Sequence, residues 1–179
     1  MRGTIMNYPL TLPTILEHAG RLHGAQEIVS LMPNKSVHKY RFSEFYARAK
    51  KLADGLIKAG LKSGDRVGTL CWNHYAHLEA YFGVPCAGGV LHTLNLRLHA
   101  DELAYIAKHA GDRFLIVDDD LLPILEGFKN KVDFERIFVV RYNRDPLPAD
   151  MEDYEDLLVD ATSEFTYPEI DEFDACGMC

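Results

Sequence analysis

The sequence predicts an α/β fold with a mostly parallel, doubly wound sheet flanked by helices. Two observations support this fold class. From residue 66 to residue 140, four short extended runs are separated by segments with the length and apolar spacing of helices. The runs are almost entirely apolar, as expected for strands that are buried on both faces of a sheet. Alternation of this kind indicates βαβ units joined by right-handed crossovers.

An N-terminal β-hairpin is predicted over residues 27–41. The PNKS segment at residues 33–36 separates two extended runs and supplies a turn, because proline fixes φ and asparagine tolerates the left-handed conformation. We expect Ser43 to cap the next helix and Gly60 to end it. The apolar residues along one face of that helix are Phe45, Ala49, Leu52, Leu56 and Ile57.

The alternating region begins after a turn at residues 62–65. Its four predicted strands lie at residues 66–71, 90–94, 113–117 and 136–140, and its helices at residues 74–87, 100–109 and 121–128.

We divide the chain into an α/β unit over residues 1–144 and an acidic, proline-containing segment over residues 145–179. Five glutamates and seven aspartates, but no lysine or arginine, lie within residues 145–174. A solvated surface segment or linker is therefore expected there. A second hypothesis places this segment across a basic surface.

The composition excludes several classes of protein. The chain of 179 residues suits one domain, and 47% hydrophobic with 26% charged residues is an ordinary globular composition. A net charge of −8 argues against a nucleic-acid partner. No apolar run has the length of a transmembrane helix, and the N-terminus lacks the apolar core of a signal peptide. Four cysteines without a secretory signal indicate reduced thiols. We therefore expect a soluble, cytoplasmic protein.

The cysteines and histidines are interpreted first as scaffold. Cys71, His74 and His77 have side chains that zinc accepts, but Cys71 ends a strand and only the two histidines share a helical face. The CxxC at residues 176–179 has no following helix to lower a thiol pKa. We expect no metal or redox site, and zinc binding is a minor alternative.

The glycine pair and the acidic run also have structural interpretations. Gly88 and Gly89 follow a helix and precede a strand, whereas a phosphate loop has the opposite order, so a helix C-cap is expected. Three aspartates at residues 118–120 could hold Mg²⁺, but capping of the next helix is favoured. The aromatic residues expected to face the core or lie partly buried are Trp72, Tyr75, Tyr81 and Phe82.

Residues that directly follow two of the predicted strands are candidate substrate-cleft residues. Ligands of parallel α/β sheets bind beyond the carboxyl ends of the strands. Trp72, Asn73 and His74 follow one strand, and Asn95 and Arg97 follow another. These residues include no nucleophile with a base and no pair of carboxylates, so no catalytic residue is expected in this chain.

A longer series of motifs runs through most of the chain. Its central elements are WN at 72–73, LE at 78–79, FG at 82–83, GGV at 88–90, LN at 94–95, RL at 97–98, Glu102, YI at 105–106 and His109. PLTL at 9–12, GDRV at 64–67 and ACGM at 175–178 extend it on both sides. The series resembles a medium- or long-chain fatty-acyl-CoA synthetase of the AMP-forming, acyl-adenylate family. Leu96 departs from the proline that the family commonly has there, which weakens any precise assignment for Asn95.

The resemblance implies a large N-terminal domain of doubly wound sheets and a two-step reaction. A carboxylate attacks ATP to give an acyl-adenylate and pyrophosphate, and coenzyme A then displaces AMP to give the thioester. Fatty acid, ATP, Mg²⁺ and coenzyme A are thereby implied for the parent enzyme. The family's phosphate loop follows the strand that resembles residues 174–178, and the sequence does not contain it. We therefore expect an N-terminal fragment that is inactive and binds no cofactor alone, and that self-associates or dimerises through uncovered sheet surface.

A stand-alone, flavodoxin-like binding or scaffold module is the alternative function. It predicts a small molecule or a protein bound tightly to the purified chain, which native mass spectrometry would detect.

Overall fold

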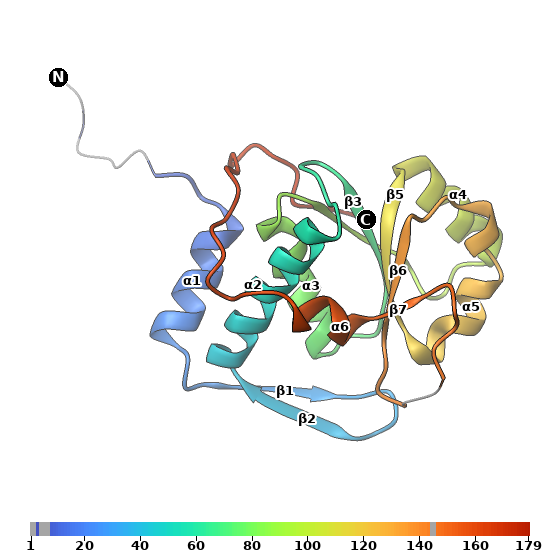
Figure 1. The fold of residues 1–179 in the computed structure, drawn as a ribbon, viewed down its shortest axis with the longest axis horizontal. Helices are drawn as coiled ribbons and strands as arrows, with labels where there is room; N and C mark the ends of the chain where they lie inside the picture. Colours follow the sequence, from blue (N-terminus) through green and yellow to red (C-terminus); the bar gives the residue numbers. More distant parts are fainter. Residues whose placement is uncertain (1–2, 4–7, 144–145) are drawn as a thin grey trace.

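A six-stranded parallel sheet forms the centre of the protein, whose structure is a computed structural model (Figure 1). The structure describes residue 3 and residues 8–143 and 146–179. The strand order is β7-β6-β5-β3-β4-β8, and each neighbouring pair is parallel. The strands are β3 (Arg66–Leu70), β4 (Val90–Thr93), β5 (Asp112–Asp118), β6 (Arg136–Val140), β7 (Glu152–Asp153) and β8 (Gly177–Met178).

Helices cover both faces of this sheet (Figure 1). One face carries α1 (Leu12–Leu22), α2 (Phe42–Lys58), α3 (Tyr75–Cys86) and α6 (Tyr154–Val159). The other carries α4 (Ala100–Ala110) and α5 (Leu122–Glu126), with single 3₁₀ turns at Asp119–Leu121 and Lys129–Lys131. None of the helices in the described ranges is long and apolar enough to cross a membrane.

Two hydrophobic cores result, one on each face of the sheet. Side chains of successive strand residues point to opposite faces, so Phe114 and Ile116 of β5 enter the core beneath α2 and α3. Leu115 and Val117 enter the core beneath α4 and α5. All four side chains are fully buried. The predicted doubly wound, mostly parallel α/β sheet is confirmed.

The chain changes direction across the sheet at β3. From β3 it passes to β4 on one side and then crosses to β5 on the other side of β3. The loops after β3 and β5 consequently lead to helices on opposite faces. This arrangement makes their carboxyl ends the topological switch point, where ligands of open α/β sheets bind.

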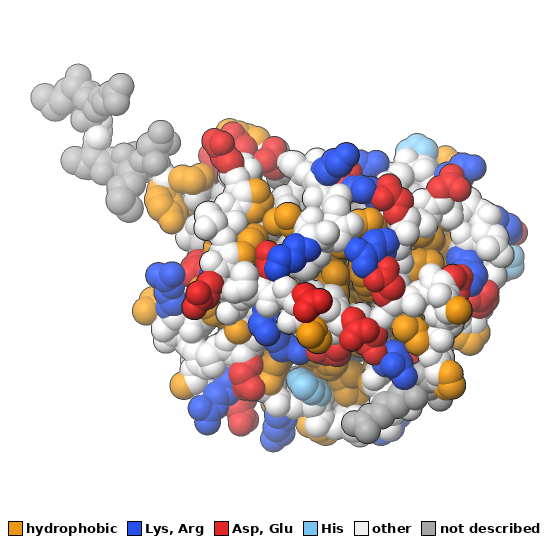
Figure 2. Space-filling view, in the orientation of Figure 1, with side chains coloured by type: hydrophobic (Ala, Val, Ile, Leu, Met, Phe, Trp, Pro, Cys, Tyr) orange, Lys and Arg blue, Asp and Glu red, His pale blue; other side chains and the backbone are white. Residues whose placement is uncertain are grey.

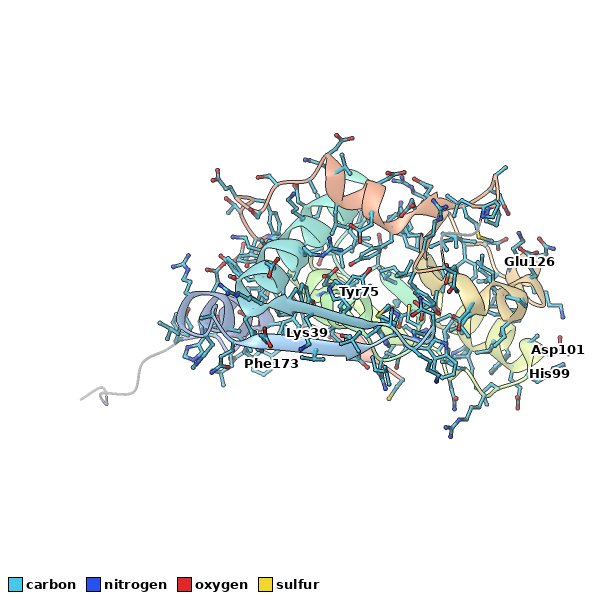
Figure 3. The ribbon with its side chains drawn as sticks, turned by 90° about the horizontal axis from the view of Figure 1, so that it is seen from below. Lys39, Tyr75, His99, Asp101, Glu126 and Phe173 are labelled. Atoms are coloured by element: carbon cyan, nitrogen blue, oxygen red, sulfur yellow. The ribbon has the colours of Figure 1, made fainter. Side chains whose placement is uncertain are left out.

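The predicted N-terminal hairpin is confirmed, with a difference in its turn. Strand β1 (Glu27–Leu31) pairs antiparallel with β2 (Val37–Arg41). Lys35, not Asn34, has positive φ, at 67°. The Asn34 side-chain oxygen instead accepts the Ser36 amide at 3.0 Å and so closes the turn. Seen from below, the hairpin crosses the start of α3, where His38 stacks on Tyr75 with ring centroids 4.1 Å apart (Figure 3).

The predicted start of α2 is wrong by two residues. Arg41 is the N-cap, and its backbone N–H donates to Glu44 Oε2 at 2.8 Å. Ser43 lies inside the helix because Glu44 already satisfies the free amide of the cap residue. The predicted C-terminal glycine is correct, since Gly60 has φ of 101° directly after the C-cap Ala59. Ile57 is 37% exposed and lies at the margin of the predicted apolar face.

Helix α1, strand β7 and helix α6 are not predicted from the sequence. Helix α1 begins after Thr11 and buries Leu16 completely. Strand β7 pairs with β6, and α6 packs on the body through Tyr154 and Leu158. Strand β8 lies within residues 174–178, where the resemblance implies a strand, and pairs with β4.

The first part of the acidic segment lies against basic side chains of the same body, as the second hypothesis expects. The ion pairs are Lys129–Asp150 at 2.8 Å, Arg141–Asp153 at 3.0 Å, Arg48–Glu155 at 2.6 Å and a pair between Arg136 and Glu152. Residues 171–179 are exposed, as the first hypothesis expects. Positive and negative side chains are interleaved on the face that carries these pairs (Figure 2). The boundary predicted between residues 144 and 145 lies outside the described residues.

A buried polar network anchors this segment. Tyr154 is fully buried and its hydroxyl donates to Glu79 at 2.8 Å. Arg48 donates to both Glu79 and Glu155, so one guanidinium joins α2, α3 and α6. Burial raises the pKa of Glu79, while Arg48 and Tyr154 oppose that shift. Because a buried carboxylate must be paired to remain in the core, this network makes α6 part of the folded body.

Candidate functional site

A hollow of about 490 Å³ opens at the carboxyl ends of β3 and β4. We call it the strand-end hollow. The residues that line it are Cys71, Trp72, Asn73, His77, Tyr81, Thr93, Leu94, Asn95, Leu96, Arg97, Leu121 and Ile124. Four of the five candidate cleft residues, Trp72, Asn73, Asn95 and Arg97, are thus brought together. The fifth, His74, lies outside its wall.

Trp72 is held at the rim of the hollow by two aspartates that follow β5. Its backbone N–H donates to Asp118 Oδ2 at 2.8 Å, and its indole Nε1–H donates to Asp120 Oδ2 at 3.1 Å. The side chain is 44% exposed, and Tyr81 on α3 is 45% exposed. Neither residue belongs to a hydrophobic core; each is partly buried, the other alternative expected, and lines the hollow. Tyr75 and Phe82 are partly buried against the core as predicted.

Asn95 and Arg97 form a compact turn after β4. The Asn95 side-chain oxygen accepts the Arg97 amide at 3.0 Å, and the Asn95 carbonyl accepts the Leu98 amide at 3.1 Å. The turn therefore forms with Leu96 in place of a proline. Within the described ranges, no hydrogen bond or ion pair engages the exposed Arg97 guanidinium. Among the described residues that line the hollow, none is acidic, so nothing in this wall neutralises the Arg97 charge.

His74 is the N-cap of α3 and not a lining residue. Its Nδ1 accepts the Ala76 amide at 3.2 Å, and its Nε2 lies 2.8 and 2.9 Å from the two oxygens of Asp118. Both side chains are fully buried. Because Nδ1 is an acceptor, the neutral ring carries its proton on Nε2 and donates to Asp118.

Cys71 and His77 have separate partners and do not converge with His74. The Cys71 thiol donates to the Ile116 carbonyl at 3.5 Å, and burial raises its pKa well above the ordinary value. His77 Nε2 lies 3.1 Å from Thr69 Oγ1, and burial lowers the pKa of the ring. Within the described residues, no three His, Cys, Asp or Glu side chains are grouped to hold a metal ion. The zinc alternative therefore has no geometric support.

The acidic run at residues 118–120 does not cap the helix that follows it, contrary to expectation. Asp118 makes no cap hydrogen bond with the 3₁₀ turn. The carboxylates instead hold neighbouring loops: Asp119 accepts the Asn143 amide at 2.8 Å, and Asp120 accepts the Tyr142 hydroxyl. The switch point brings these loops to the end of β5, where their free N–H and O–H groups compete successfully with the helix amides.

The glycine pair ends α3, as predicted. Gly88 follows the C-cap Ala87 with φ of 81°. The Gly89 amide donates to the Val84 carbonyl at 3.0 Å. A Cβ at Gly89 would also lie 3.0 Å from the Leu61 side chain. These contacts are those of a helix end and leave no cradle for a phosphate.

A second hollow, of about 460 Å³, adjoins the first through Tyr81 and Thr93. Its other lining residues are Leu12, Phe82, Leu91, Cys176, Gly177, Met178 and Cys179. This largely apolar site is not predicted from the sequence. Its walls combine residues of α3 and β4 with residues from both ends of the chain, and no local motif connects them.

Comparisons with known proteins relate this geometry to enzymes. A family model described as AMP-binding enzyme matches residues 16–179. The chain is 36% identical to a medium-chain-fatty-acid–CoA ligase of Ectopseudomonas oleovorans, with 100% of this chain and 34% of the relative aligned. It is 41% identical to a long-chain-fatty-acid–CoA ligase of Thermus thermophilus, with 98% of this chain and 32% of the relative aligned.

A solved structure with the same fold supports these matches. The crystal structure of an anthranilate CoA ligase in complex with anthranoyl-AMP superposes with a TM-score of 0.84 over 99% of this chain and 33% of that chain. At 20% sequence identity this likeness shows the fold alone. The chain spans about a third of the length of the curated relatives it matches.

Proposed function

The chain belongs to the AMP-binding enzyme family, and from this premise we propose that it is the N-terminal part of an AMP-forming fatty-acid–CoA ligase. The proposed reaction joins a medium- or long-chain fatty acid to coenzyme A through an acyl-adenylate, with release of pyrophosphate and AMP. One observation carries the proposal. Two relatives named as fatty-acid–CoA ligases align with at least 98% of this chain at 36% and 41% identity.

The strand-end hollow is the part of this chain that we assign to substrate. Trp72 and Asn73 form one side, and Asn95 and Arg97 form the other. The indole and the leucine side chains of the wall fit an apolar or planar group. The unpaired Arg97 guanidinium fits a carboxylate or phosphate, which it can bind through two parallel hydrogen bonds. We propose that His74, which lies behind this wall, helps to hold it in place through its hydrogen bond to Asp118.

ATP, Mg²⁺ and coenzyme A enter the proposal through the family. The described residues themselves fit neither ATP nor Mg²⁺, because Gly88 and Gly89 end a helix and the aspartates at 118–120 are hydrogen-bonded to loops. The 179 residues act as one wall of the substrate site, and we propose that alone they do not form the adenylate.

An ATP–pyrophosphate exchange assay tests the inactivity of the chain alone. We expect no exchange above background when the purified 179-residue protein is given octanoate or dodecanoate with ATP and Mg²⁺. Exchange that depends on the fatty acid would overturn this part of the proposal.

A chimera tests the ligase function itself. Residues 1–179 replace the matching third of the Thermus thermophilus ligase, to which they are 41% identical. We expect the chimera to form AMP from ATP when both a fatty acid and coenzyme A are present. A chimera that melts cooperatively but forms no AMP would contradict the assignment, and the unaltered ligase is the positive control.

A further inference from the structure

Two loops at the carboxyl edge of the sheet meet at the acidic run that ends β5. Asp118 contacts the loop between β3 and α3, Asp119 contacts the loop after β6, and Asp120 contacts both. No member of this run lines the strand-end hollow. The aspartates therefore act on the hollow through the residues that they hold.

Asp118 makes the tightest of these connections. It is fully buried and accepts the Trp72 amide at 2.8 Å. It also accepts His74 Nε2–H at 2.8 and 2.9 Å. The two donors belong to the neighbours of Asn73, so one carboxylate holds the Trp72 backbone and the His74 side chain on either side of a residue that lines the hollow.

The tautomer of His74 makes this arrangement specific for a carboxylate. Its Nδ1 accepts the Ala76 amide, so Nε2 must be the donor. The Trp72 amide is also a donor. An asparagine at position 118 would turn its NH₂ group toward one of these two donors, and one hydrogen bond would be lost.

Asp120 extends the arrangement to the Trp72 side chain. Its Oδ2 accepts the indole N–H at 3.1 Å, and its Oδ1 accepts the Tyr142 hydroxyl. Asp120 is exposed, so its contacts are not needed to fill the core. The backbone and the ring of Trp72 are consequently held by two different aspartates of one strand end.

We propose that Asp118 and Asp120 are positioning residues that fix Trp72 and Asn73 in the wall of the strand-end hollow. The inference deepens the proposed function, and it rests on that function for the claim that the hollow receives substrate. Preorganised wall residues reduce the entropy that ligand binding must overcome. His74 contributes to the same arrangement, because it is the second donor to Asp118.

NMR spectroscopy tests, without any ligand, whether the aspartates hold the loop between β3 and α3 in place. Trp72 is the single tryptophan of the chain, so its indole N–H gives one assignable signal in amide-proton NMR spectra. In Asp118→Asn we expect hydrogen exchange of the Trp72 amide to rise at least about ten-fold. The amide then faces either the new NH₂ group or a neutral oxygen, so its charge-assisted hydrogen bond is lost in both orientations. In Asp120→Ala we expect the indole signal to shift while the amide keeps its protection.

Asp112→Asn is the matched control. Asp112 forms an equally buried pair with His92, at 2.8 Å, away from the hollow. We expect this variant to lose thermal stability but to keep the Trp72 signals and amide protection under conditions where it is folded. A merely structural role for Asp118 predicts the same Trp72 response in both asparagine variants.

Two outcomes would overturn the inference: an unchanged Trp72 amide in Asp118→Asn, or an equal change in Asp112→Asn. Should Asp118→Asn fail to fold, Asp120→Ala still decides, since an unchanged indole signal there contradicts the proposed contact. An inactive chimera with intact loop signals would reject the ligase function and leave the positioning role standing.

Discussion

Two histidine–aspartate pairs in this protein have almost the same geometry and different surroundings. His74 lies 2.8 and 2.9 Å from the oxygens of Asp118, and His92 lies 2.8 Å from both oxygens of Asp112. All four side chains are at most 2% exposed. The two pairs therefore share their chemistry and their burial.

The pair of His92 and Asp112 is enclosed by strands. His92 is on β4, Asp112 begins β5, and both meet over Gly68 of the intervening strand β3. A Cβ at Gly68 would lie 2.9 Å from Asp112 Oδ2, so the glycine leaves the space that the pair occupies. Burial raises the pKa of Asp112, and the hydrogen bond to His92 opposes this shift. This pair links β4 to β5 across β3.

The pair of His74 and Asp118 lies beyond the carboxyl ends of β3 and β5 and holds a loop. Asp118 also accepts the Trp72 amide, and Trp72 lines the strand-end hollow. The comparison teaches that position along the strands, and not residue type, decides the task of such a pair. One stabilises the interior of the sheet, and the other sets the wall of a proposed binding site.

The largest expected effect comes from breaking the enclosed pair. Asp112→Ala leaves His92 buried without its partner, and we expect the free energy of unfolding to fall by about 3–5 kcal/mol. Denaturant titration measures this change. His92→Ala with Asp112→Ala completes a double-mutant cycle, and additive losses in that cycle would show that the two side chains are not coupled.

A histidine without a carboxylate partner is expected to give a smaller, pH-dependent effect. Burial lowers the pKa of His77 below 6.5. Between the folded and the unfolded pKa, the ring is therefore protonated in the unfolded chain and neutral in the folded protein. The stability from the neutral ring is complete above the unfolded pKa and is lost as the pH falls toward the folded pKa. We expect up to about 1.4 kcal/mol of stability to be lost per pH unit in this window. In His77→Gln this component should disappear from unfolding measured between pH 7 and pH 5.5; parallel curves for the two proteins would contradict the assignment.

The smallest effect on stability is expected at Arg97. The guanidinium is exposed and unpaired, so Arg97→Ala should change the free energy of unfolding by no more than about 0.5 kcal/mol. In the chimera, the same change should lower kcat/KM at least about ten-fold, because a charge-assisted hydrogen bond to substrate is removed. Arg97→Lys keeps the charge and should lose less. Unaltered steady-state kinetics in Arg97→Ala would exclude this residue from the site.

Local patterns in the sequence predict the frame of the fold. The apolar runs at β3 to β6 and the two strands of the hairpin depend on neighbouring residues, and their predictions are confirmed. The grouping of Asn73 with Asn95 was also predictable, because residues after parallel strands meet at one edge of a sheet.

Long-range polar contacts could not be predicted in the same way. Trp72 and His74 bind an aspartate that lies 46 and 44 residues further along the chain. Local rules assign Asp118 to the next helix, whereas the fold presents it with stronger donors from another loop. Helix α6 likewise depends on Glu79, to which Tyr154 donates across 75 residues. Hydrophobic periodicity does not identify polar partners that are this distant in the sequence.

The activity of two chimera variants tests most directly whether the His74–Asp118 pair serves the binding site while the His92–Asp112 pair serves only the sheet. Fatty-acid-dependent AMP formation is measured for Asp118→Asn and Asp112→Asn at a temperature where both are folded. We predict at least about a ten-fold loss of kcat/KM in Asp118→Asn and near-parental activity in Asp112→Asn. Equal losses in the two variants, or full activity in Asp118→Asn, would contradict the account.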